Sequence, residues 1–122
     1  MSNAAQAYSR TSHTTAAPRE IEAQALLKAA RQLLDVQANW AGPDRNMHNA
    51  LLFNRRLWSI FMSAATQPAD NAQPAEVRQN IANIGVFVMK QTVDMQLNPD
   101  PAKLQSLIDI NRNLAAGLSG RV

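Results

Sequence analysis

The chain has 122 residues, no cysteine and a net charge of +3 from 12 basic and nine acidic residues. This length fits one domain, and the absence of cysteine excludes disulfides, zinc–thiolate sites and thiol catalysis, as expected in the cytoplasm. The basic residues are spread along the chain, so we expect no direct binding of nucleic acid. No apolar run approaches the roughly 18–20 residues of a membrane helix, so we expect no membrane association.

The amino-terminal part of the chain differs in composition from the rest. Residues 1–17 are rich in Ser, Thr, Asn and Ala, which predicts a flexible, disordered arm with Tyr8 as its only possible anchor. Residues 18–122 are then expected to form a single helical domain. Its first helix should begin near Pro18 and end before Gly42. The apolar stripe of this helix is Leu26, Ala29, Leu33, Val36 and Trp40.

The second and last helices have clear boundary signals. Asp44 is suited to cap a second helix that reaches about Gln67. Asp100 and Pro101 can start the last helix, and Gly120 suits a left-handed residue at its end. No stretch alternates with period two over a useful length. The predicted fold is therefore all-α, a small bundle of about four mostly antiparallel helices.

The third helix has an unusual distribution of apolar residues. It is predicted to open at Pro74 and to continue toward Leu97. Val86, Phe87 and Val93 project away from its main apolar stripe, so the middle of the helix is apolar on nearly every side. Such a helix is either central in the bundle or covered by something else.

Two asparagines fall in the middle of apolar helix faces. Asn54 lies among the apolar residues of the second helix, and Asn111 lies among those of the fourth. An unpaired carboxamide in a core costs roughly 1–3 kcal/mol. We therefore predict a specified polar contact for each, as a structural polar core or, alternatively, as a contact with a ligand.

The sequence lacks the residue patterns of an enzyme or a cofactor site. His13 and His48 have no second histidine or carboxylate at ligand spacing, so we expect no metal site. The four glycines are scattered and form no phosphate-binding loop, and the acidic residues offer no inward-facing carboxylate pair. We therefore expect no catalytic residues, no cofactor and no enzymatic activity.

Short blocks in separate helices carry a family resemblance. They are Asn54-Arg55-Arg56-Leu57-Trp58, Leu107-Ile108-Asp109-Ile110-Asn111-Arg112, Gly117-Leu118 and Pro18-Arg19-Glu20-Ile21-Glu22. In this order and at this separation, the blocks resemble those of the flagellar biosynthesis regulator FlaF family. The resemblance runs from about Ala7 to Gly120, which is nearly the whole chain.

The resemblance implies a flagellin-binding secretion chaperone that is also a positive regulator of flagellin synthesis. Its expected partners are flagellin, through the terminal helical region, and the translational regulator FlbT. An alternative is a post-transcriptional regulator that acts through FlbT or flagellin mRNA without stable flagellin binding. Because amphipathic helices bind in apolar grooves, a helical bundle with spare apolar surface is compatible with the first role.

The candidate partner-binding residues combine apolar and basic side chains. They are Arg55, Trp58, Met62, Val86, Phe87, Val93 and Arg112. The apolar residues have an alternative role in closing the bundle. The arginines have an alternative role in a solvated flank or an internal ion pair, for which Asp109 is the nearest candidate to Arg112.

Overall fold

The structure is a computed structural model that describes residues 17–67 and 74–120. The predicted arm and Tyr8 lie outside these residues, except for Ala17, which begins the first helix. All regular structure in the described part is helical, which confirms the predicted all-α fold. The elements are α2 (Ala17–Ala38), α3 (Arg45–Ala65), α4 (Ala75–Leu97), the 3₁₀ turn η1 (Pro101–Lys103) and α5 (Leu104–Leu118).

The helix boundaries follow the predicted local signals. The Asp44 side chain accepts a hydrogen bond from the Met47 amide at 2.9 Å and caps α3. The Asp100 side chain accepts a hydrogen bond from the Ala102 amide and caps η1, a 3₁₀ turn that opens at Pro101 before α5 begins. Gly120 has a φ of +71°, the left-handed conformation that favours glycine after a helix.

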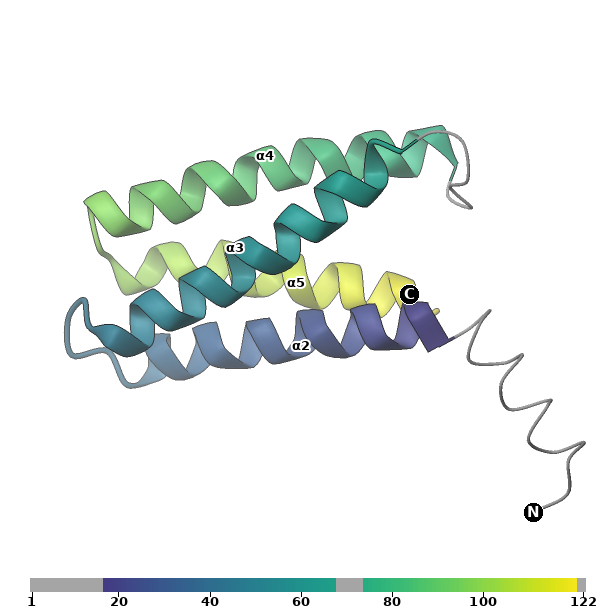
Figure 1. Cartoon of the computed structure of the whole chain (residues 1–122). Coiled ribbons are helices and arrows are strands. Elements are labelled where there is room, and N and C mark those ends of the chain that lie inside the picture. The colour runs from purple at the N-terminus through teal and green to yellow at the C-terminus, as the bar shows by residue number, and fades with distance from the viewer. Residues whose placement is uncertain (1–16, 68–73, 121–122) are drawn as a thin grey trace, which may run out of the picture.

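Successive helices run in opposite directions, and the four are not equally enclosed (Figure 1). Helices α2 and α5 lie side by side and contact each other along much of their length. Helix α3 crosses diagonally from the end of α2 to the start of α4. Helix α4 contacts α3 extensively and α5 very little, so it lies at the edge of the bundle.

The core forms where the apolar faces of these helices meet. Removal of such side chains from water is the main stabilising term of the fold. Its largest fully buried apolar side chains are Trp58, Leu26, Leu33, Met47, Leu51, Met95, Leu104, Leu107, Ile108 and Val88.

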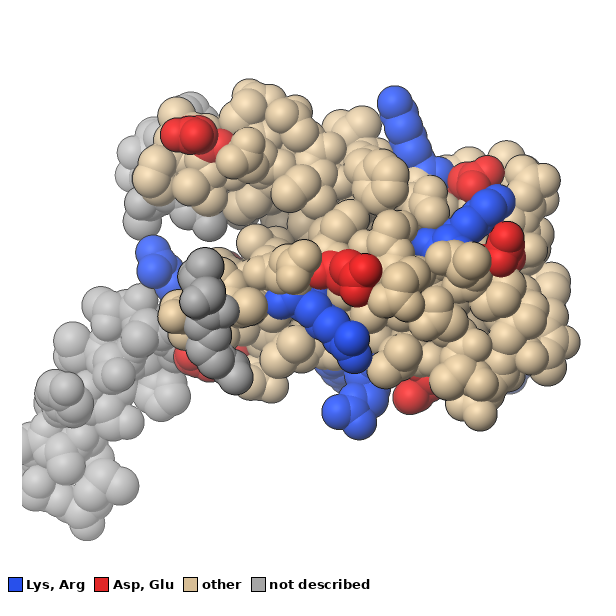
Figure 2. Space-filling model, turned by 180° about the vertical axis from the view of Figure 1, so that it is seen from behind, with Lys and Arg blue, Asp and Glu red and all other residues tan. Residues whose placement is uncertain are grey.

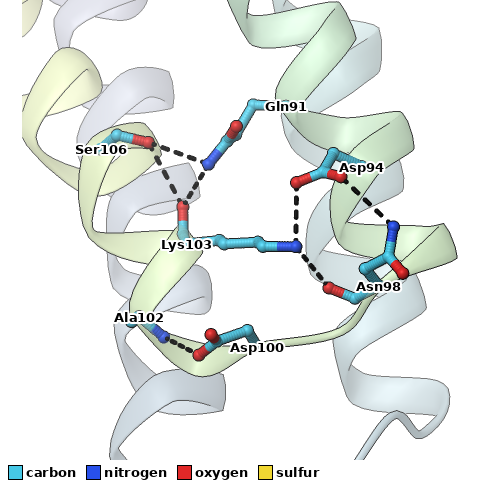
Figure 3. A network of polar contacts seen from close by, with 7 residues as sticks. All are labelled: Gln91, Asp94, Asn98, Asp100, Ala102, Lys103 and Ser106. Atoms are coloured by element: carbon cyan, nitrogen blue, oxygen red, sulfur yellow. Dashed lines mark hydrogen bonds and ion pairs between the residues drawn. The ribbon is translucent and has the colours of Figure 1, made fainter.

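A polar network fixes the turn between α4 and α5 (Figure 3). The Lys103 ammonium lies 2.9 Å from the Asp94 carboxylate and donates to the Asn98 carbonyl at 2.7 Å. The Gln91 side chain donates to the Lys103 carbonyl at 3.1 Å and to the Ser106 hydroxyl at 3.4 Å. These contacts tie the last turns of α4 to the start of α5. No helix in the described part is long and apolar enough to cross a membrane.

Candidate partner-binding surface

The two predicted core asparagines form a buried chain of hydrogen bonds with Trp58. The Trp58 indole Nε1–H donates to Asn111 Oδ1 at 2.8 Å, and Asn111 Nδ2 donates to Asn54 Oδ1 at 2.7 Å. All three side chains are fully buried. Because an indole N–H can only donate, it fixes the orientation of the Asn111 carboxamide, which in turn fixes that of Asn54.

This chain of hydrogen bonds shows the structural role of each of the three residues. Asn54 and Asn111 bond to each other across α3 and α5, as a structural polar core requires. The chain ends at Asn54 Nδ2, a buried donor without a partner. Trp58 is enclosed and satisfied, so its placement on a partner-binding surface is wrong for this structure. Its indole packs in the core, because Asn111 supplies the acceptor that a buried indole needs.

Met62 lies at the contact between α3 and α4. It is half-buried, and a methyl group added at Gly85 of α4 would overlap its side chain. Gly85 is itself buried, so the absence of a side chain there allows α3 and α4 to approach closely. Met62 therefore contributes mainly to helix packing, with part of its surface left accessible.

The two candidate arginines are exposed and lie on different helices, Arg55 on α3 and Arg112 on α5. The alternative local pair between Arg112 and Asp109 does not form among the described residues, and Asp109 accepts a hydrogen bond from Gln105 at 2.9 Å. Within residues 17–67 and 74–120, the ion pair that forms is Lys103 with Asp94. Both arginines therefore remain available to a partner, but at separate places.

The remaining predicted residues form an apolar surface on α4. Val86, Phe87 and Val93 are 46, 44 and 53% exposed. The structure adds Val77, Ile84 and Leu97, of which Leu97 is 74% exposed. We call these six side chains the α4 surface. Single exposed apolar residues are ordinary, but six on one helix leave much apolar surface in contact with water.

The packing of α4 explains why this surface is free. Its buried face meets α3 and consists of Ile81, Gly85, Val88, Thr92 and Met95. Ile84 and Phe87 lie on the same flank of the helix as Gln91, which bonds to α5 at the turn. Away from the turn, α4 and α5 diverge (Figure 1), and Ile84 and Phe87 on this flank remain 37 and 44% exposed. Val86, Val93 and Leu97 lie on the side of the helix roughly opposite its buried face.

Sequence reasoning left open whether this helix is central or covered. The structure places it at the edge, and several of its apolar side chains are only partly covered by the rest of the protein. Val77 and Ile84 belong to the main apolar stripe of the sequence, which is why their exposure was missed. The divergence of α4 from α5 is a property of the tertiary structure, and helix periodicity carries no signal for it.

The titratable groups of the described residues include two with shifted pKa values. In the part of the chain that the structure describes, no group of three or more His, Cys, Asp or Glu residues could hold a metal ion. Burial raises the pKa of Glu22, although the nearby Arg19 opposes it, and the Lys103 hydrogen bond lowers the pKa of Asp94. An apolar helical surface of this kind fits an amphipathic helix from a partner.

A comparison with known families decides the relationship. The model of the family described as Flagellar protein FlaF matches residues 4–118. The chain belongs to the FlaF family of flagellar proteins. No curated protein and no solved structure matches it. The predicted family is thus confirmed over nearly the whole chain, and the α4 surface lies within a flagellar protein.

Proposed function

We propose that this FlaF-family protein is a flagellin-binding secretion chaperone and a positive regulator of flagellin synthesis. It acts in the cytoplasm, without enzymatic activity, and its partner is the terminal helical region of flagellin. The α4 surface receives the apolar face of that region. Arg55 and Arg112 are candidate contacts at the margins of the complex, where charges affect specificity more than affinity.

The observation that carries this proposal is the exposed apolar surface of α4 in a protein of a flagellar family. An unassembled flagellin end that is amphipathic and poorly ordered needs its apolar face covered before export. A helix with partly exposed apolar side chains on two of its sides can supply that cover. The ordering of the flagellin end on binding lowers the affinity gained per unit of buried area, so a reversible complex is expected.

The alternative is post-transcriptional control through FlbT or flagellin mRNA without stable flagellin binding. Direct RNA binding requires several basic residues on one surface. On the face shown in Figure 2, Lys and Arg are scattered among Asp and Glu, with broad uncharged areas between them. This distribution supports a protein partner over RNA, and FlbT remains the second candidate partner.

The test is size-exclusion chromatography with light scattering of the protein mixed with its cognate flagellin monomer. A parallel sample contains flagellin that lacks its carboxyl-terminal helix, and a third contains flagellin that lacks its amino-terminal helix. A complex that one of the truncations abolishes would support the proposal and identify the end that binds.

Equal binding of all three flagellins would contradict recognition of a terminal helix. Absence of any complex would contradict flagellin as the direct partner. In that case the same measurement with FlbT, and a shift assay with the flagellin leader RNA at near-physiological salt, would distinguish the two forms of the alternative. Binding to RNA would weaken steeply as salt is raised.

A further inference from the structure

We infer that the cleft between the end of α2 and the start of α3 is a second binding site for a short peptide segment of a partner. That segment has an apolar centre, a basic group at one end and an acidic group at the other. The cleft has a volume of about 740 Å³, which is within the usual range for ligand pockets. Its lining includes no residue of α4, so this site is separate from the α4 surface and independent of the proposed function.

The floor of the cleft is apolar and aromatic. Its side chains are Val36, Trp40, Leu52 and Phe53, all half-buried. Trp40 follows the last turn of α2 and Phe53 lies in the third turn of α3, so the floor extends across both helices. An apolar peptide side chain on this floor would bury its own surface and cover two half-exposed aromatic rings.

The rim of the cleft is rich in uncharged amides. Asn46 and Asn49 lie on α3 and Asn39 follows α2. A carboxamide both donates and accepts hydrogen bonds, so these side chains match the N–H and C=O groups of a peptide backbone. Asn39 already donates to the Asp35 carbonyl at 2.9 Å, whereas the carboxamides of Asn46 and Asn49 are exposed. The rim thus provides backbone recognition without a fixed charge.

The charged residues of the cleft are separated by sign. The Lys28 ammonium lies 5.3 Å from the centre of the Phe53 ring. This contact shows which residues of the antiparallel helices α2 and α3 lie opposite each other. In that register Asp35 and Asp44 lie toward the loop that joins the helices, and Arg56 lies toward Lys28 at the other end. The ends are about ten helical residues apart, or roughly 15 Å, which five extended residues span.

This separation decides which occupant the cleft fits. Aromatic rings and amides also suit a nucleobase, but a nucleotide has no cationic group for the carboxylates of Asp35 and Asp44 at one end of the cleft. Asp44 also caps α3, so its carboxylate already occupies the amino-terminal end of the helix, where an anion could otherwise bind. A peptide with a basic group near Asp35 and an acidic group near Arg56 satisfies both ends.

The test uses the full chain labelled with ¹⁵N and a seven-residue synthetic peptide with blocked termini. The peptide has lysine at one end, three central apolar residues and glutamate at the other. Two tryptophans report the result. The Trp40 indole signal should shift on titration, whereas the signal of Trp58, buried and bonded to Asn111, should stay in place and show that the fold is intact.

Charge reversal makes the test specific. Arg56→Glu should weaken binding of the mixed-charge peptide about fivefold, the scale of one exposed ion pair. A peptide with lysine at both ends should bind Arg56→Glu more tightly than it binds the unmodified protein. A peptide with glutamate at both ends should bind Asp35→Lys more tightly than it binds the unmodified protein. Phe87→Asp, on the separate α4 surface, should leave peptide binding unchanged.

Three results would overturn the inference. The first is a peptide affinity that neither charge reversal changes. The second is tighter binding of a single-stranded oligonucleotide than of the peptide, which would assign the cleft to nucleic acid. The third is a Trp40 shift that depends on protein concentration without peptide, which would assign the cleft to a second copy of the chain.

Discussion

A simple globular protein has an apolar centre and a polar surface, whereas this bundle has polar groups at its centre and exposed apolar side chains at its α4 edge. At the centre, two carboxamides and an indole N–H lie fully buried among apolar side chains. At the edge, valines, an isoleucine, a leucine and a phenylalanine lie exposed on α4. The buried polar groups are bonded to one another, whereas the exposed apolar groups are only partly covered by the rest of the protein. The first set therefore serves the fold, and the second is the surface that we propose for a partner.

The largest expected effect tests the structural role of the polar chain. Asn111→Leu removes the acceptor of Trp58 and the donor to Asn54, and it leaves both buried groups unpaired. We expect the free energy of unfolding to fall by about 2–4 kcal/mol. Asn54→Leu removes only the end of the chain, together with its unpartnered Nδ2. It should cost about 1–2 kcal/mol.

Urea denaturation followed by circular dichroism measures both losses. The order of the two variants is the informative result, because it follows from the direction of the hydrogen bonds. A larger loss for Asn54→Leu would mean that the chain does not end at Asn54. Loss of partner binding in a variant that remains fully folded would assign the asparagines to a ligand.

The next prediction tests the α4 surface. Phe87→Asp places a charge among exposed apolar side chains, so it should weaken flagellin binding at least tenfold, the equivalent of about 1.4 kcal/mol. Ile21→Asp on α2 is the matched control, because Ile21 is also exposed, at 67%, but lies on another helix. It should bind as the unmodified protein does. Isothermal titration with flagellin measures both affinities.

Circular dichroism distinguishes a loss of binding from a loss of fold. If Phe87→Asp unfolds the protein, Phe87 belongs to the core and its assignment to a binding surface is wrong. If the two variants weaken flagellin binding equally, the effect is one of general charge and the α4 surface is not the site.

Much of the fold could be predicted because its signals are local. Asp44 as a cap, Pro101 at a helix start and Gly120 at a helix end each act within a few residues of their own position. The contact between Asn54 and Asn111 could also be anticipated, since a buried carboxamide needs a partner and the sequence places two carboxamides on apolar helix faces. Periodicity and capping therefore give the helices and part of the core.

The candidate site was less predictable because exposure depends on the distance between helices. Trp58 and Phe87 were both predicted to bind a partner, yet one is fully buried and the other is 44% exposed. Trp58 lies within the buried stripe of α3 and faces Asn111, whereas Phe87 lies outside the buried stripe of α4. The α2–α3 cleft has the same origin, since the volume between two helices is set by their packing.

A pair of glycine substitutions tests the close contact that holds α4 on α3. Gly85→Ala places a methyl group against Met62, so we expect a net loss of about 1–2 kcal/mol despite the better helix propensity of alanine. Gly117→Ala in α5 meets nothing within 4 Å, so it should stabilise the protein by roughly 0.5–1 kcal/mol. Thermal denaturation compares them, and a stabilising Gly85→Ala would contradict the tight α3–α4 contact.

The smallest expected effect concerns the tether at the other end of α4. The Lys103 hydrogen bond lowers the pKa of Asp94, so ionised Asp94 favours the folded state. This contribution is present above the unfolded pKa and is lost as the pH falls through the lower, folded pKa. The melting temperature of the unmodified protein should therefore exceed that of Asp94→Asn at pH 7, and the difference should shrink below about pH 5.

Glu22 provides a control of opposite sign within the same chain. Burial raises its pKa, so ionised Glu22 disfavours the folded state and its protonation favours it. Glu22→Gln should raise the melting temperature slightly at pH 7, and this gain should disappear as the pH falls below the ordinary glutamate pKa. If both variants changed the melting temperature in the same direction at pH 7, the Asp94 effect would reflect a general charge change, and the Lys103 tether would not hold α4 against α5.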